Sequence, residues 1–279
     1  MKPPAFDMVR PQTVSEALQY LAESPDSKLI AGGQSLVPVM NFRLAAPALL
    51  IDLNRVAGLA GIRCEAGVLR IGAMTRQQSL LGDPLVVRCA PLLAAALPHV
   101  GHLQTRSRGT VGGSLAHADP SAELPLVMVT LDAVITVRSR ERERTVPARA
   151  FFTDAMTTDL AADEMITEVA VPAAPADARV AFRELARRHG DFAIVAAAAQ
   201  RTAAGLSVAV GGLEAVPRLC RRLMADFAGD PPPRGRWPEL IRAELADAAP
   251  LADLQADGDY RRHLAAVLLQ DVLAEVFAP

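Results

Sequence analysis

Two glycine-rich polar segments are the residues in this sequence best suited to do chemistry. The first segment, AGGQS at residues 31–35, follows an apolar run, and the second segment, TVGGS at residues 110–114, again combines a Gly-Gly pair with a serine. Glycine lets the backbone approach a ligand closely, and successive N–H groups in such a turn bind anions. One copy alone is also compatible with an ordinary tight turn. Two copies favour a pair of loops that close on one extended anionic ligand, such as a diphosphate.

Several other chemistries lack the residues that they need. Lysine occurs only at positions 2 and 28, so the GxxxxGK[ST] loop of a P-loop nucleotidase is absent, and neither segment matches the GxGxxG pattern of a doubly wound sheet. No GxSxG elbow surrounds either serine, which disfavours a hydrolase. The histidines show no metal-ligand spacing, and no convincing nucleophile or acid–base pair stands out. We therefore predict neither a metal site nor a catalytic residue in this chain.

Three cysteines, Cys64, Cys89 and Cys220, lie far apart in the sequence and form no CxxC pair. Their number and spacing argue against a disulfide framework and against a four-thiolate iron–sulfur cluster. We predict isolated buried thiols.

Composition describes a globular chain. Of its 279 residues, 51% are hydrophobic, and the formal charge of −2 gives no basic excess that would favour nucleic acid. No apolar run approaches the roughly 20 residues of a membrane span. The first residues contain no apolar signal core, so we expect a cytoplasmic protein.

The elements that must position the two segments follow from periodicity. We expect a first unit over residues 1–55, with a helix at 13–24, strands at 28–32 and 48–53, and a short helix at 36–43. A second unit over 56–175 combines strands at 68–74, 133–139 and 164–172 with a helical region at 76–97; the charged run at 138–145 predicts a solvated hairpin edge. A third unit over 176–279 has strands at 192–201 and 206–214 followed by helices. The mixture predicts an α+β fold.

Four motifs in a fixed order carry a resemblance to a known family. They read AGGQSLVPVMNFRLAAPALLIDLN, GHLQTRSRGTVGGSLAHADPSAELP, DEMITEVAVP and FRELARRHGDFAIVAAAA, and the tail DGDYRRHLAAVLLQDVL adds to them. The chain resembles the FAD-binding medium subunits of molybdenum hydroxylases, the flavoproteins of the carbon monoxide dehydrogenase and xanthine dehydrogenase family. The resemblance implies a two-subdomain FAD-binding fold of the PCMH type, like that of vanillyl-alcohol oxidase, over residues 1–175. A C-terminal domain of antiparallel strands and a helical bundle, of the carbon monoxide dehydrogenase flavoprotein type, is implied over 176–279.

The resemblance also implies roles for individual residues. The two segments correspond to the FAD diphosphate loops, His102 to a flavin contact, and Ile166 to an apolar residue whose backbone meets the adenine. Glu123 stands where many members have an aspartate that hydrogen-bonds the sugar portion, and Asp119 is a second acidic candidate. Arg183 stands where relatives have a cofactor-proximal lysine, and Phe192 matches an aromatic position beside the flavin ring. The implied FAD-binding residues are therefore Ala31, Gly32, Gly33, Gln34, Ser35, His102, Thr110, Val111, Gly112, Gly113, Ser114, Asp119, Glu123, Ile166, Arg183 and Phe192.

The implied function is electron transfer within a complex. A molybdopterin-binding large subunit would hold the molybdenum cofactor, and a small subunit would hold two [2Fe–2S] clusters. This chain would pass electrons from those clusters through FAD to an external acceptor, within what we expect to be a dimer of heterotrimers. It would not turn over substrate alone. The alternative is a self-contained FAD-dependent oxidase or reductase, which needs a substrate domain with acid–base residues; the third unit shows none.

Overall fold

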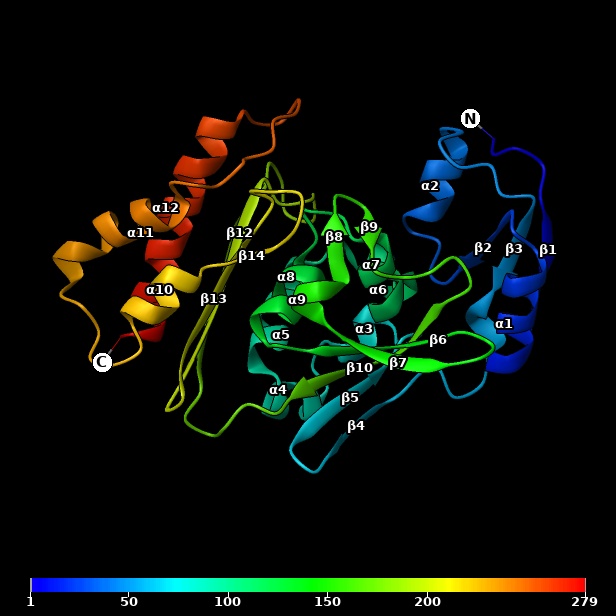
Figure 1. Cartoon of the computed structure of the whole chain (residues 1–279), viewed down its shortest axis with the longest axis horizontal. Helices are drawn as coiled ribbons and strands as arrows, with labels where there is room; N and C mark the ends of the chain where they lie inside the picture. Colours follow the sequence, from blue (N-terminus) through cyan, green and yellow to red (C-terminus); the bar gives the residue numbers. More distant parts are fainter. Residues whose placement is uncertain (1, 279) are drawn as a thin grey trace.

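The N-terminal end of the chain is a small parallel sheet with two helices. The computed structural model describes residues 2–278. In this sheet β3 (Leu49–Asp52) lies between β1 (Asp7–Val9) and β2 (Ser27–Ile30), and both pairs are parallel (Figure 1). The amphipathic helix α1 (Val14–Glu23) buries its apolar stripe against this sheet, and α2 (Leu36–Asn41) follows β2 after the first segment.

The middle of the chain is a five-stranded antiparallel sheet under a layer of short helices. The strand order is β4 (Ile62–Glu65), β5 (Val68–Gly72), β10 (Met165–Pro172), β6 (Val134–Arg138) and β7 (Glu143–Pro147). The covering helices are α3 (Gln77–Leu80), α4 (Pro84–Cys89), α5 (Pro91–Ala96), α6 (Leu103–Arg108), α7 (Val111–His117), α8 (Glu123–Thr130) and α9 (Ala148–Phe151). A two-stranded sheet, β8 (Phe152–Asp154) and β9 (Thr157–Thr158), completes this part.

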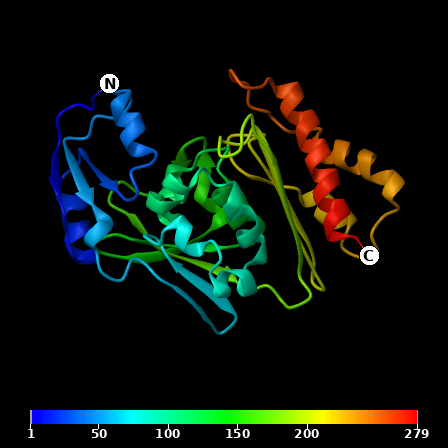
Figure 2. The ribbon, with the colours of Figure 1, turned by 180° about the vertical axis from the view of Figure 1, so that it is seen from behind.

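The C-terminal part is a four-stranded antiparallel sheet with helices on one side. Its strands are β11 (Arg179–Leu185), β12 (Val195–Thr202), β13 (Gly205–Gly211) and β14 (Arg218–Leu219). The helices α10 (Arg221–Asp226), α11 (Trp237–Leu245) and α12 (Gly258–Val276) cover the outer face, and the inner face packs on the middle part (Figure 2).

The alternation of a β-strand divides this sheet between two cores. In β12, Ala196 and Ala198 belong to the core shared with α5 and α8, whereas Ala197 and Ala199 belong to the core under α12. A run of four alanines therefore separates two apolar layers, and their small side chains set how closely both layers approach.

The structure refines the expectation for the charged run and corrects the one for the cysteines. The charged run does form the β6–β7 hairpin, but Arg144 is anchored there by Glu164, which is buried and accepts at 2.6 and 2.8 Å. The expectation of isolated thiols is wrong for one pair: Cys64 on β4 and Cys89 at the end of α4 bring their Sγ atoms within 2.8 Å. Their separation of 25 positions hides this contact from the sequence, because it arises only when α4 packs beside β4.

Candidate cofactor site

The first segment is a turn whose backbone amides point to no acceptor in the protein. It connects β2 to α2, and Gly33 adopts a φ of +73°, which only glycine reaches without strain. The N–H groups of residues 32–35 form no hydrogen bond within residues 2–278. The Gln34 amide donates to the Gly32 carbonyl at 3.2 Å and stiffens the turn. Four successive free donors in one turn make a binding surface for an anion.

The second segment differs from the expected turn, because Gly112 and Gly113 lie in the first turn of α7. Its amides are already bonded: Val111 donates to the Thr75 carbonyl at 3.1 Å, and Gly112 to the Ala73 carbonyl at 2.8 Å. Thr110 is the N-cap of α7, and its hydroxyl accepts from the Gly113 N–H at 3.1 Å. The glycines of this segment have no side chains, so another backbone or a ligand can approach closely, and Ser114 adds a hydroxyl. Of the two segments, the first alone has free backbone donors.

The two segments touch through their glycines. A Cβ at residue 32 would overlap the carbonyl of Arg108, and a Cβ at Gly113 would lie 3.5 Å from the Cβ of Ala31. A Cβ at Gly112 would come within 2.6 Å of the Ala73 side chain. Close backbone approach, rather than turn conformation alone, explains these glycines.

Two polar residues that the sequence patterns did not indicate hold the segments together. The Arg76 guanidinium donates both to the Arg108 carbonyl and to the side-chain oxygen of Asn54. Asn54 in turn donates to the Ala31 carbonyl at 3.0 Å. Burial and the neighbouring charge of Arg108 lower the pKa of Arg76. Asn54 is the last residue of the first of the four motifs, which was its only signal in the sequence.

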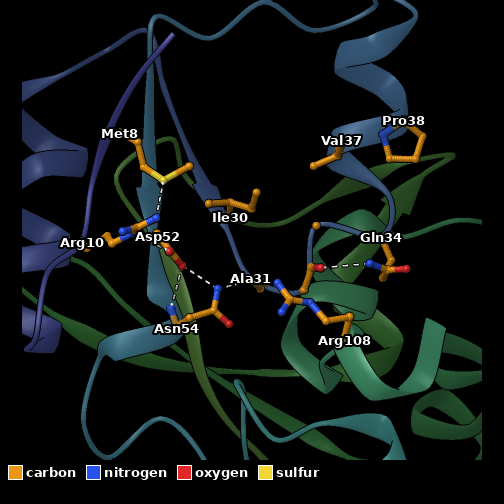
Figure 3. Close-up of a pocket in the computed structure, with 12 residues that line it drawn as sticks. Met8, Arg10, Ile30, Ala31, Gln34, Val37, Pro38, Asp52, Asn54 and Arg108 are labelled. Atoms are coloured by element: carbon orange, nitrogen blue, oxygen red, sulfur yellow. Dashed lines mark hydrogen bonds and ion pairs between the residues drawn. The ribbon is translucent and has the colours of Figure 1, made fainter. Parts of the chain in front are cut away.

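A cavity of about 500 Å³ opens beside the first segment (Figure 3). Arg10 and Arg108 are its cations; Arg10 is paired with Asp52 at 3.3 Å, whereas Arg108 has no ion pair within residues 2–278. The cavity therefore combines free backbone donors with one uncompensated guanidinium. Its lining is Met8, Arg10, Ile30, Ala31, Gly32, Gly33, Gln34, Val37, Pro38, Asp52, Asn54 and Arg108.

His102 of α6 contacts the loop that follows β11, and the same loop carries Phe192. His102 is the exposed N-cap residue of α6, and a Cβ at Gly190 would overlap its ring. The ring of His189 stacks on that of His102 with centroids 6.5 Å apart. Phe192 is 52% exposed near the end of the same loop. The C-terminal part thus reaches the middle part at His102, leaving an aromatic ring open beside it.

Glu123 begins α8 in a buried group of titratable side chains. Its pKa is raised to about 7, mainly by burial and to a lesser degree by the carboxylate of Glu184, while the backbone N–H and His99 act in the opposite direction. His99 lies 3.1 Å from Glu184, and this contact raises the pKa of the imidazole. Asp119 also binds the local backbone, because its carboxylate accepts from the Ser121 N–H at 2.9 Å in the turn before α8.

Ile166 and Arg183 do not join the two segments. The Ile166 side chain is buried in the core on β10, and the strand is irregular between Ile166 and Glu168, beside the Thr167 carbonyl that accepts from Ala73. Arg183 points to the other face of its sheet and pairs with Glu275 of α12. Its neighbour Glu184 faces the middle part instead, as strand alternation requires.

The arrangement offers hydrogen-bond donors and one positive charge to an anion. No group of three or more His, Cys, Asp or Glu side chains in residues 2–278 could hold a metal ion. Over the same residues, no helix is long and apolar enough to cross a membrane. The free amides, the lone guanidinium and the glycine contacts fit the diphosphate of FAD, whose charge they would match without lysine.

Two family models together match nearly the whole chain. Residues 4–174 match the FAD binding domain in molybdopterin dehydrogenase, and residues 180–276 match the CO dehydrogenase flavoprotein C-terminal domain. The first match alone covers more than half of the chain.

Proteins and structures with similar sequences agree with these models. The chain is 36% identical to the nicotine 6-hydroxylase medium subunit of Paenarthrobacter nicotinovorans, over 100% of this chain and 99% of that one. It is 47% identical, over 71% of this chain and 67% of the other, to the 6-hydroxypseudooxynicotine dehydrogenase complex subunit alpha of the same organism. A solved chain of carbon monoxide dehydrogenase from Hydrogenophaga pseudoflava superimposes with a TM-score of 0.96 at 34% identity, covering 100% of this chain and 99% of that one. The α+β fold is thus that of the carbon monoxide dehydrogenase medium chains, and the chain belongs to the FAD-binding medium subunits of molybdenum hydroxylases, the carbon monoxide dehydrogenase and xanthine dehydrogenase family of oxidoreductases.

Proposed function

We propose that the diphosphate of FAD is held by the amides of residues 32–35 with the guanidinium of Arg108, and that the second segment closes over it. The observation that carries this proposal is the set of four free N–H groups in the first segment, three of which, those of Gly32, Gly33 and Gln34, belong to residues that line a cavity with one uncompensated cation. Ser114 adds a hydroxyl donor. Because the amides of the second segment are bonded within the protein, its glycines serve mainly to let the ligand and the two backbones come close.

The remaining contacts divide among the parts of the chain. Residues 1–175, with subdomains 1–55 and 56–175, form the cofactor-binding domain, and residues 176–279 form a C-terminal domain that contributes Phe192. His102 and Phe192 flank the flavin ring, Glu123 and Asp119 serve the sugar portion, and the irregular backbone of β10 near Ile166 meets the adenine. Arg183 is occupied by Glu275, so the proposal leaves it out.

In the assembled enzyme, FAD held by the amides of residues 32–35 and by Arg108 would supply electron transfer between [2Fe–2S] clusters and an external acceptor. The clusters belong to a small subunit, the molybdenum cofactor to a molybdopterin-binding large subunit, and the complex is a dimer of heterotrimers. This chain binds and orients the flavin and leaves the oxidation of substrate to the large subunit.

The loop assignment is tested with Gly33→Asp, which places a carboxylate and a strained backbone among the free amides. We expect the variant to fold and to lose FAD on gel filtration, while Gly229→Asp, at an open position, retains it. Stoichiometric flavin in Gly33→Asp would show that the diphosphate binds elsewhere.

The subunit assignment is tested separately. The FAD-loaded chain alone is assayed with candidate substrates and a dye acceptor, before and after addition of the molybdenum and iron–sulfur subunits. Turnover that depends on those subunits supports the proposal. Rapid substrate-dependent reduction of the isolated chain would instead favour a self-contained oxidase or reductase.

A further inference from the structure

Cys64 and Cys89 form a thiol pair outside the cofactor site. Their Sγ atoms lie 2.8 Å apart, closer than two sulfur atoms that merely pack against each other. Cys89 is 4% exposed at the end of α4, and Cys64 is half-buried on β4, so Cys64 is the more accessible residue of the two. This is the arrangement of an attacking thiol and a resolving thiol.

A positive charge lies beside this pair. Arg88 is the residue before Cys89, in the last turn of α4. The hydrogen bond with Cys89 raises the pKa of the Cys64 thiol, and Arg88 opposes that rise by stabilising the thiolate. Oxidation should therefore accelerate as pH rises.

The pair also lies beside the connection between the middle part and the C-terminal part of the chain. The Ala174 N–H donates to the Cys89 carbonyl at 2.8 Å, and the Ala173 N–H donates to the carbonyl of Gly67, in the β4–β5 turn, at the same distance. A bond between the two sulfurs would link β4, which is an edge strand, to the helix end that fixes this connection.

We propose that Cys64 and Cys89 are a redox modification site, closed to an intrachain disulfide by hydrogen peroxide. The Cys64 thiolate attacks one peroxide oxygen, the O–O bond breaks, and Cys64 becomes a sulfenic acid as hydroxide leaves. The Cys89 sulfur then attacks the Cys64 sulfur, the S–S bond forms, and the hydroxyl leaves as water with the Cys89 proton. Two thiols are oxidised, and one peroxide is reduced to two water molecules once hydroxide takes up the proton first released by Cys64.

The test uses the full, FAD-loaded chain. The protein is treated with hydrogen peroxide at pH 7 and pH 9, denatured, alkylated and mapped by mass spectrometry. We expect the three free thiols to fall to Cys220 alone, with a Cys64–Cys89 linked peptide that dithiothreitol removes. The linked form should appear faster at pH 9, and its melting temperature should rise by a few degrees, because the bond restricts the unfolded chain.

Cys220 is the internal control, because it is fully buried and burial raises the pKa of its thiol. Cys220→Ser should form the linked peptide as the native chain does, Cys64→Ser should not, and Cys89→Ser should accumulate a sulfenic acid at Cys64 that a dimedone probe captures. Three intact thiols after peroxide, a link that involves Cys220, or disulfides only between chains would overturn the proposal. Unchanged flavin content in all three variants would separate this result from any failure of the cofactor assignment.

Discussion

The carbonyl oxygen of Arg108 occupies the space into which a side chain at Gly32 would extend. The first segment thus meets the backbone just before the second segment, and the guanidinium of Arg76 donates to that same carbonyl. The spacing between the segments is set by the absence of one Cβ.

Gly32→Ala should therefore separate the two segments. The new Cβ meets main-chain atoms rather than a flexible side chain, so the segments must shift before the diphosphate can bind. We expect FAD to bind at least about tenfold more weakly, a loss of roughly 1.4 kcal/mol, measured by flavin fluorescence titration. Gly229→Ala, which adds a Cβ in open space, is the matched control; equal affinity in both variants would contradict the prediction.

Arg108→Gln should weaken FAD binding through loss of charge. A hydrogen bond to a charged group contributes about 1.5–3 kcal/mol, so the dissociation constant should rise roughly 10- to 100-fold. The backbone carbonyl that binds Arg76 is retained. Arg10→Gln lines the same cavity but removes a guanidinium already paired with Asp52, and we expect a smaller effect. The dissociation constants of both variants are measured at several salt concentrations. An effect of Arg10→Gln as large as that of Arg108→Gln, or an unchanged salt dependence in Arg108→Gln, would contradict the prediction.

Glu123 should make the stability of the chain fall as pH rises from about 4.5 to 7. Its pKa, about 7 in the folded chain against 4.5 ordinarily, means that the folded state holds the proton over this range while the unfolded state loses it. The difference of 2.5 pH units at 1.36 kcal/mol each corresponds to about 3 kcal/mol. The raised pKa of His99 acts in the same direction above its ordinary value of 6.5.

Glu123→Gln should flatten this dependence, because the amide carries no proton to lose. Denaturant unfolding at pH 5, 6, 7 and 8 measures it. The groups around Glu123 are His99, Glu184 and Asp119, and all three are unchanged in the variant. A variant with the native slope between pH 5 and 7 would show that another group carries the dependence.

His99→Ala should leave the carboxylate of Glu184 without its partner. That carboxylate is 7% exposed, and its other oxygen has no hydrogen bond in the described part of the chain. We expect the free energy of unfolding to drop by about 1–3 kcal/mol. The double variant His99→Ala/Glu184→Gln should be less destabilised than the sum of the single variants, because it removes the stranded charge. Strict additivity would mean that the pair does not interact.

The sequence predicted those features that local patterns encode. The helix at 13–24 has an N-cap at Thr13 and an apolar stripe, and it forms as α1 (Val14–Glu23). The region expected to be helical over 76–97 is helical but divides into three, because Pro84 and Pro91 each begin a new helix.

Features that depend on tertiary contacts could not be predicted from the sequence. Gly112 and Gly113 resemble a turn by propensity, yet they lie inside α7, where a Cβ at Gly112 would overlap Ala73 and a Cβ at Gly113 would overlap the Thr110 hydroxyl. Arg76 and Asn54 bind main-chain carbonyls of segments more than twenty residues away, for which no residue pattern exists. Strand β11 was not predicted, so the direction of its side chains could not be predicted either. Glu184 faces the middle part of the chain, whereas Arg183 faces α12.

Strand β12, with its four alanines, packs between α8 and α12. The size of its side chains therefore affects the position of α8 and of Glu123 at its start. Ala198 faces the core of α8, the helix that Glu123 begins, whereas Ala197 faces α12. Enlarging Ala198 to valine would press on the cofactor side, and the same change at Ala197 would press on the outer helices. Successive residues of this one strand pack against opposite layers. Substitutions in β12 could therefore shift either α8 or the outer helices without a direct contact to the proposed cofactor site.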